Sequence, residues 1–126
     1  MLKYIDKDEY NKLLGVTSIP DNFEQYVIEA STYINSKTFN RIDENDLHEN
    51  VKYATALIIE KIANSEMQKQ EVGNLKSQNI EGWSESYSSP EEIEKKLEED
   101  KINIVKTFLW NVIGKDGNPL LYCGVG

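Results

Sequence analysis

The residues of this 126-residue chain that could carry out chemistry are few and isolated. His48 is the single histidine, and it could act as a general base or as a metal ligand beside Glu44, Asp46 or Glu49. No second histidine and no cysteine pair completes a site around it, so we interpret His48 as a surface residue of a helix. The acidic run over residues 43–50 also lacks the central glycine and the twelfth-position glutamate of a calcium loop.

The other reactive groups do not indicate an enzyme either. Cys123 is the only cysteine, so it cannot form a disulfide within the chain, and no histidine or basic neighbour in sequence would activate its thiol. Between Pro90 and Asp100, Glu and Lys alternate at the i, i+4 spacing of a solvated helix face. The glycines, Gly73 among them, are spaced like turn residues and form no phosphate-binding loop. We therefore expect no enzymatic activity, no cofactor and no bound metal.

Charge and hydropathy argue against two classes of partner. The formal net charge is -8, whereas non-specific binding to nucleic acids depends on Lys and Arg. No stretch approaches the roughly 18 to 20 apolar residues of a transmembrane helix. Residues 1–10 lack the apolar core of a signal peptide. These features predict a soluble, cytoplasmic protein with no membrane partner and no sequence-specific contact with DNA.

The hydrophobic periodicity predicts an all-α fold: a small helical bundle of three main helices and a short N-terminal helix, in a single domain over residues 1–126. The short helix has Asp6 as its N-cap, Glu9 three residues later and Gly15 as its end. The third helix, over about residues 45–68, carries the broadest apolar stripe. It is the expected central helix of the core.

The last helix is predicted to run from Pro90 to Gly114, with Ser89 as its N-cap. Its first half is charged and has only Ile93 and Leu97 as apolar markers. We expect these first turns to project into solvent, while the more apolar second half, from Ile102 to Ile113, packs against the other helices.

Two segments lie outside the predicted helices: a long extended loop over about residues 70–89 and a non-helical C-terminal tail over about residues 114–126. The loop is rich in Ser, Gly and Asn, yet Trp83 and Tyr87 alternate with polar residues at the period of an extended strand. Aromatic residues are enriched where proteins meet partners. Either the loop is an assembly arm with these two residues as anchors, or it is a disordered surface loop.

The tail ends in a short apolar run that follows a turn and is broken by glycine. We predict that it extends onto another molecule, so that a chain lacking residues 117–126 still folds. The alternative is that the tail folds back over the subunit's own core. The candidate contact residues are Leu120, Leu121, Tyr122 and Val125.

Taken together, these features resemble the small head-tail connector proteins, also called head completion or adaptor proteins, of long-tailed bacteriophages and prophages. The resemblance spans nearly the whole chain. It rests on an opening Y..LLG, on the segments YINSKTFNRI and VKYATALIIEKIA, on the Ser-rich IEGWSESYS, and on the closing PLLYCGVG.

The resemblance implies a structural protein that assembles as a twelve-fold ring beneath the portal, at the head-tail interface of the virion. Its partners would be further copies of itself, the portal protein and a stopper or tail-completion protein, and DNA would pass through its channel. Before assembly it would reside in the host cytoplasm. The tail would dock the ring to the portal. The competing interpretation is a small helical protein-binding or regulatory module of prophage origin that acts as a monomer or dimer.

Overall fold

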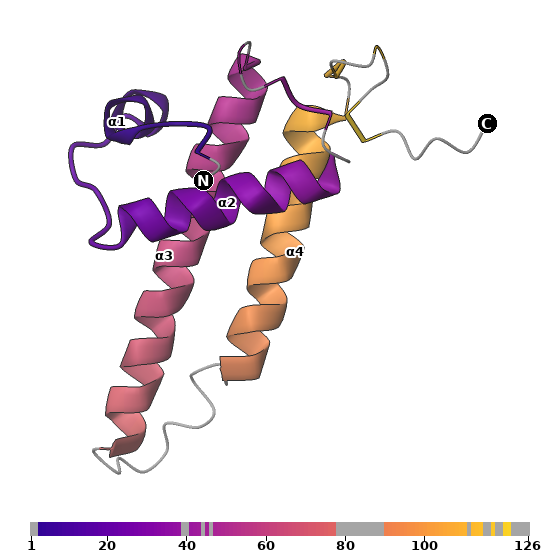
Figure 1. The fold of residues 1–126 in the computed structure, drawn as a ribbon. Helices are drawn as coiled ribbons and strands as arrows, with labels where there is room; N and C mark the ends of the chain where they lie inside the picture. The colour runs from indigo at the N-terminus through magenta and orange to yellow at the C-terminus, as the bar shows by residue number, and fades with distance from the viewer. Residues whose placement is uncertain are drawn as a thin grey trace.

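The fold is built on a pair of long antiparallel helices that a third helix crosses. The computed structural model describes residues 3–38, 41–43, 45, 47–77, 90–110, 112–114, 117 and 120–121. Over these residues the chain forms α1 (Lys7–Leu14), α2 (Phe23–Lys37), α3 (Glu49–Ser77) and α4 (Pro90–Leu109). Figure 1 shows α3 and α4 side by side, α2 lying across both, and α1 beside the first half of α3. The predicted all-α bundle is confirmed.

The short helix α1 begins and ends at the residues that the sequence predicts. The Asp6 carboxylate accepts the backbone N–H of Glu9 at 2.8 Å, and the Glu9 carboxylate accepts the backbone N–H of Asp6 at 3.2 Å. This reciprocal pair satisfies two N–H groups that an uncapped helix would leave without partners. Gly15 ends the helix with a φ of 66°, a left-handed conformation that favours glycine.

Helix α3 is the centre of the core, as predicted. Its buried surface is broader than the single apolar stripe that the sequence predicts. Val51, Ala54, Ile58 and Ile62 lie on the predicted stripe and are buried. Thr55, Ala56 and Ile59 are buried as well, because α1, α2 and α4 all pack against α3. The buried Thr55 hydroxyl donates to the Val51 carbonyl at 2.7 Å, so its burial leaves no unpaired donor.

The predicted start of the loop at residue 70 is wrong, because α3 continues to Ser77. Gly73 therefore lies within a helix and is not a turn residue. A glycine inside a helix costs only about 1 kcal/mol relative to alanine. The Lys, Gln, Glu and Leu residues around it favour the helix and outweigh that cost. Trp83, Tyr87 and Ser89 lie outside the described residues.

Helix α4 begins at Pro90 as predicted, but two expectations about it are wrong. Its first turns do not project into solvent: Ile93 and Leu97 are buried, since this part of α4 runs alongside α3. The helix also ends at Leu109 and not at Gly114. Beyond Leu109 the chain turns, and the Val112 carbonyl accepts the backbone N–H of Leu120 at 2.8 Å.

A close contact explains why the chain needs a glycine just after α4. A Cβ atom on Gly114 would lie 2.8 Å from the Cβ of Arg41 and 2.9 Å from its carbonyl oxygen. The segment after α4 thus packs tightly against the connection between α2 and α3. This contact joins residues far apart in sequence, so no local pattern around Gly114 predicts it.

Candidate interaction surfaces

The first tail residues belong to the subunit's own core. Leu120 is 1% exposed and lies among the buried side chains, next to Ile42, Val51 and Gly114. Leu121 is half-buried and packs against the same core. The prediction that Leu120 extends onto another molecule is therefore wrong, because its side chain completes the core at the end of the bundle. Tyr122, Cys123 and Val125 lie outside the described residues.

His48 has a structural role at the start of α3. Its side chain is exposed, and Nδ1 accepts the backbone N–H of Asn50 at 3.0 Å. The His48 carbonyl accepts the backbone N–H groups of Val51 and Lys52. His48 thus serves as the N-cap of the longest helix, and this bond requires a lone pair on Nδ1. Among the residues that the structure describes, no group of three or more His, Cys, Asp or Glu side chains could hold a metal ion.

The start of α3 is also tied to the end of α4. The Asn50 side-chain amide donates to the carbonyl of Phe108 at 3.0 Å, in the last turn of α4. The rings of Tyr53 and Phe108 meet edge to face with their centroids 5.1 Å apart. An amide donor and an aromatic pair therefore fix this end of the helix pair.

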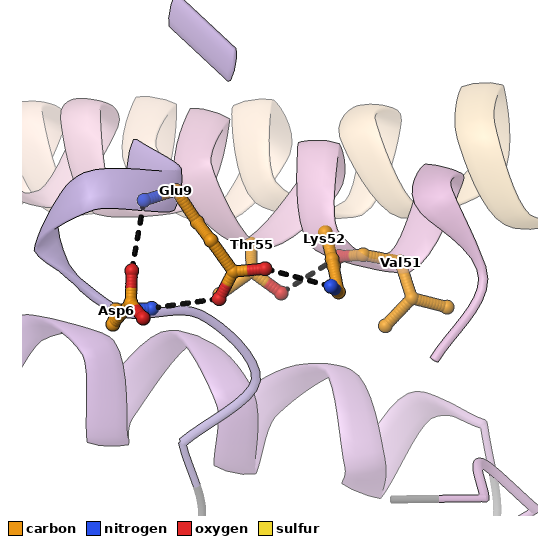
Figure 2. Close-up of polar contacts among 5 residues, drawn as sticks. All are labelled: Asp6, Glu9, Val51, Lys52 and Thr55. Carbon is orange, nitrogen blue, oxygen red and sulfur yellow. Dashed lines mark hydrogen bonds and ion pairs between the residues drawn. The ribbon is translucent and has the colours of Figure 1, made fainter. Parts of the chain in front are cut away.

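An ion pair connects α1 to α3 (Figure 2). Lys52 Nζ lies 2.6 Å from the second carboxylate oxygen of Glu9, whose first oxygen caps α1. The hydrogen bond to Glu9 raises the pKa of Lys52 above its ordinary value of 10.5. One glutamate thus closes the capping box and also holds α1 against the central helix.

Two large apolar side chains stand exposed at the end of α4. Trp110 is 65% exposed and Ile113 is 60% exposed. Sequence reasoning counted Ile113 among the packed residues and passed over Trp110. The buried face of this segment follows Val105, Leu109 and Val112 at helical spacing. Trp110 falls off that face, and this offset was the signal in the sequence that could have identified it.

A groove of about 720 Å³ lies between α2 and the first half of α4, over the middle of α3. Tyr33 lines it, and the ammonium groups of Lys101 and Lys37 lie 4.5 Å and 5.4 Å from the centre of its ring. Burial raises the pKa of the Tyr33 hydroxyl, and the charge of Glu98 adds to the shift. The phenol therefore stays neutral at physiological pH, and two cations stand beside its ring in an open groove.

The far end of the helix pair is held partly by charge. Lys69 of α3 contacts Glu94 of α4 and lies 3.6 Å from Glu66 of its own helix. Nearby on α3, Met67 is 59% exposed. Such partly exposed ion pairs contribute little to stability.

The two segments predicted to mediate assembly attach at opposite ends of the helix pair. Ser77 and Pro90, which flank the segment 78–89, lie at one end, whereas Leu109, the last residue of α4, lies at the other (Figure 1). At 1.5 Å per residue, α4 separates these ends by roughly 30 Å. The subunit can therefore present two different surfaces to two different neighbours.

Comparisons of the chain with protein-family models, with curated proteins and with solved structures gave no significant match. Within the part of the chain that the structure describes, no helix is both long enough and apolar enough to cross a membrane.

Proposed function

We propose that this chain is a structural virion protein, a head completion or adaptor protein that forms a ring beneath the portal and joins the DNA-filled head to the tail or stopper protein. The main support is that Ser77 and Pro90, which flank residues 78–89, lie at one end of the helix pair, whereas Leu109, after which the tail follows in sequence, lies at the other end. A connector has to hold one neighbour on each side, and this arrangement supplies two separate attachment points.

The exposed apolar side chains support the same proposal. Trp110 and Ile113 follow the end of α4, on either side of the buried Val112, whose carbonyl accepts the backbone N–H of Leu120. Tryptophan is among the residues that most often dominate binding energy at protein interfaces. In this proposal the tail beyond Leu121 docks the ring to the portal, and the segment 78–89 contacts the next protein or a neighbouring subunit.

The charge of the chain fits a channel through which DNA must move. A net charge of -8 disfavours non-specific binding of the subunit to the phosphate backbone. A ring of such subunits would guide DNA without holding it.

The proposal can be tested by deleting the gene from the phage or prophage that encodes the chain. We expect DNA-filled heads and free tails to accumulate, and purified wild-type chain to restore joining when it is added to the extract. A matched chain that lacks residues 122–126 should fold and yet fail to restore joining. Normal virion yield after the deletion would contradict the proposal, and would favour the monomeric or dimeric regulatory module.

A further inference from the structure

Two surface features of the subunit complement each other but lie on different parts of it. We call the first the Trp110 patch: Lys106 and Trp110 at the end of α4, with Ile113 just beyond. The second is the Tyr33 groove described above, whose relevant lining residues are Ile28, Glu29, Thr32, Tyr33, Lys37 and Lys101. The patch exposes two large apolar side chains beside Lys106, and the groove is a hollow of about 720 Å³.

The electrostatic character of the groove suits an indole ring. Lys101, whose ammonium group also lies 2.7 Å from a Glu98 carboxylate oxygen, and Lys37 place their ammonium groups beside Tyr33. The face of tryptophan is the aromatic surface that attracts cations most strongly. Ile28 and Leu97 add apolar surface to the groove. An entering indole would therefore meet both cations and hydrocarbon.

Three acidic residues (Glu29, Glu66 and Glu94) and two basic residues (Lys37 and Lys101) line the groove, whereas the patch carries the basic Lys106. Lys106 precedes Trp110 by one helical turn and is exposed, and Glu29 is exposed at the edge of the groove. Within the described residues, neither charge takes part in an ion pair. Docking of the patch in the groove would bring these two unpaired charges toward each other.

A subunit cannot fill its own groove with its own patch. Trp110 lies about 13 Å farther along the axis of α4 than Lys101, at 1.5 Å per residue. This separation exceeds the reach of a tryptophan side chain. A Trp110 side chain in this groove would therefore have to come from a second copy of this chain.

We propose that Trp110 of one copy inserts into the Tyr33 groove of the next copy. The patch and the groove are different surfaces, so the contact is heterologous, and heterologous contacts repeat around a ring when the rotation closes. This inference rests on the proposed function, since it identifies the contact between neighbouring subunits of the ring.

Two single variants and their mixture test the contact. Trp110→Ala removes the projecting side chain, and Thr32→Arg fills the groove from an exposed position on α2. Sedimentation velocity at increasing concentration should show wild-type species larger than a dimer. Each variant alone should associate at least about tenfold more weakly, because a central tryptophan is a typical hot spot. A mixture of the two should give a 1:1 dimer and nothing larger, since only one intact contact can form.

Controls separate loss of the contact from loss of the fold. Met67→Ala truncates an equally exposed apolar side chain outside both surfaces and should associate like the wild type. If either test variant has altered circular dichroism, the charge pair replaces it: Lys106→Glu and Glu29→Lys should each weaken association, and together they should restore it. Lys95→Glu, an exposed reversal on the same helix, should have no effect.

A wild-type chain that remains monomeric at every concentration would overturn the inference, as would a folded Trp110→Ala chain that associates like the wild type. The proposed function fails by a different result. If wild-type chain does not restore head-tail joining, the connector function is wrong; if joining is restored and Trp110→Ala associates normally, only the assigned contact is wrong.

Discussion

The two ends of the α3–α4 pair are held together by different interactions. At the end where His48 caps α3, which we call the capped end, the first turn of α3 meets the last turn of α4, and Leu109 and Leu120 are fully buried there. At the opposite end, which we call the loop end, the second half of α3 lies beside the first half of α4. Ile93 and Leu97 are buried at that end, but the polar contacts are the exposed ion pairs of Lys69.

This difference indicates where stability and adaptability reside. Burial of a leucine contributes about 1.5 to 3 kcal/mol, whereas an exposed ion pair contributes 1 kcal/mol or less, as order-of-magnitude values. The capped end should therefore set the stability of the subunit. The loop end should tolerate substitution and open more easily.

The largest expected effect comes from two truncations that differ by five residues. Removal of residues 117–126 deletes Leu120 from the core at the capped end, so we expect a loss of about 2 to 5 kcal/mol and a melting temperature lower by roughly 10 °C or more. Removal of residues 122–126 keeps Leu120 and should leave the melting temperature nearly unchanged. Equal melting temperatures of the two truncated chains in calorimetry would show that the stability of the capped end does not depend on Leu120. This expectation replaces the one from sequence, in which the longer truncation was harmless.

Glycine-to-alanine substitutions should have opposite signs at the two ends. At the capped end, Gly114→Ala places a methyl group against the backbone of Arg41, and we expect a loss of about 1 to 3 kcal/mol. At the loop end, Gly73→Ala lies in helical backbone and should stabilise the chain by up to about 1 kcal/mol. Urea denaturation measures both. A stabilising Gly114→Ala would refute the close contact with Arg41.

The part of the fold that sequence predicts well is the part that local signals determine. Asp6, Glu9 and Gly15 lie within one short helix, and their types and spacing suffice to place its two ends. Pro90 likewise marks the start of α4. The prediction was wrong at Gly73 because glycine is common in turns. The free-energy cost of one glycine inside a long helix is nevertheless small.

The features of the fold that the sequence did not predict depend on contacts between segments that are far apart in the chain. The end of α4 is set by the return of Leu120 to the Val112 carbonyl and by the approach of Gly114 to Arg41. The burial of Ile93 follows from the position of α4 beside α3. Of the candidate contact residues, Leu120 was misassigned for the same reason, whereas Trp110 could have been found from its position off the buried face.

A smaller contrast concerns single polar contacts at the two ends. Asn50→Ala removes the donor to the Phe108 carbonyl at the capped end, and we expect a loss of about 1 kcal/mol. Lys69→Ala removes the ion pairs at the loop end and should cost less than about 0.5 kcal/mol. The comparison uses the midpoint of urea unfolding. A greater loss at Lys69 would reverse the ranking of the two ends.

The smallest expected effect is the pH dependence of the ion pair between Glu9 and Lys52. The pKa of Lys52 is raised in the folded chain, so the pair's stabilisation is fully present below the ordinary lysine value and is lost as the pH rises above 10.5, through the raised pKa. Because both side chains are partly exposed, the change should be below about 1 kcal/mol. Lys52→Met should lack this alkaline decrease; an identical pH profile would mean that the pair does not hold α1.

Electron cryomicroscopy of a head-tail junction, in any phage particles produced from the genome that encodes this chain, tests the connector proposal most directly. We predict a ring beneath the portal into whose subunits the α1–α4 bundle fits, with residues beyond Leu121 extending to the portal. A complete junction in which every ring is accounted for by other proteins would contradict the proposal.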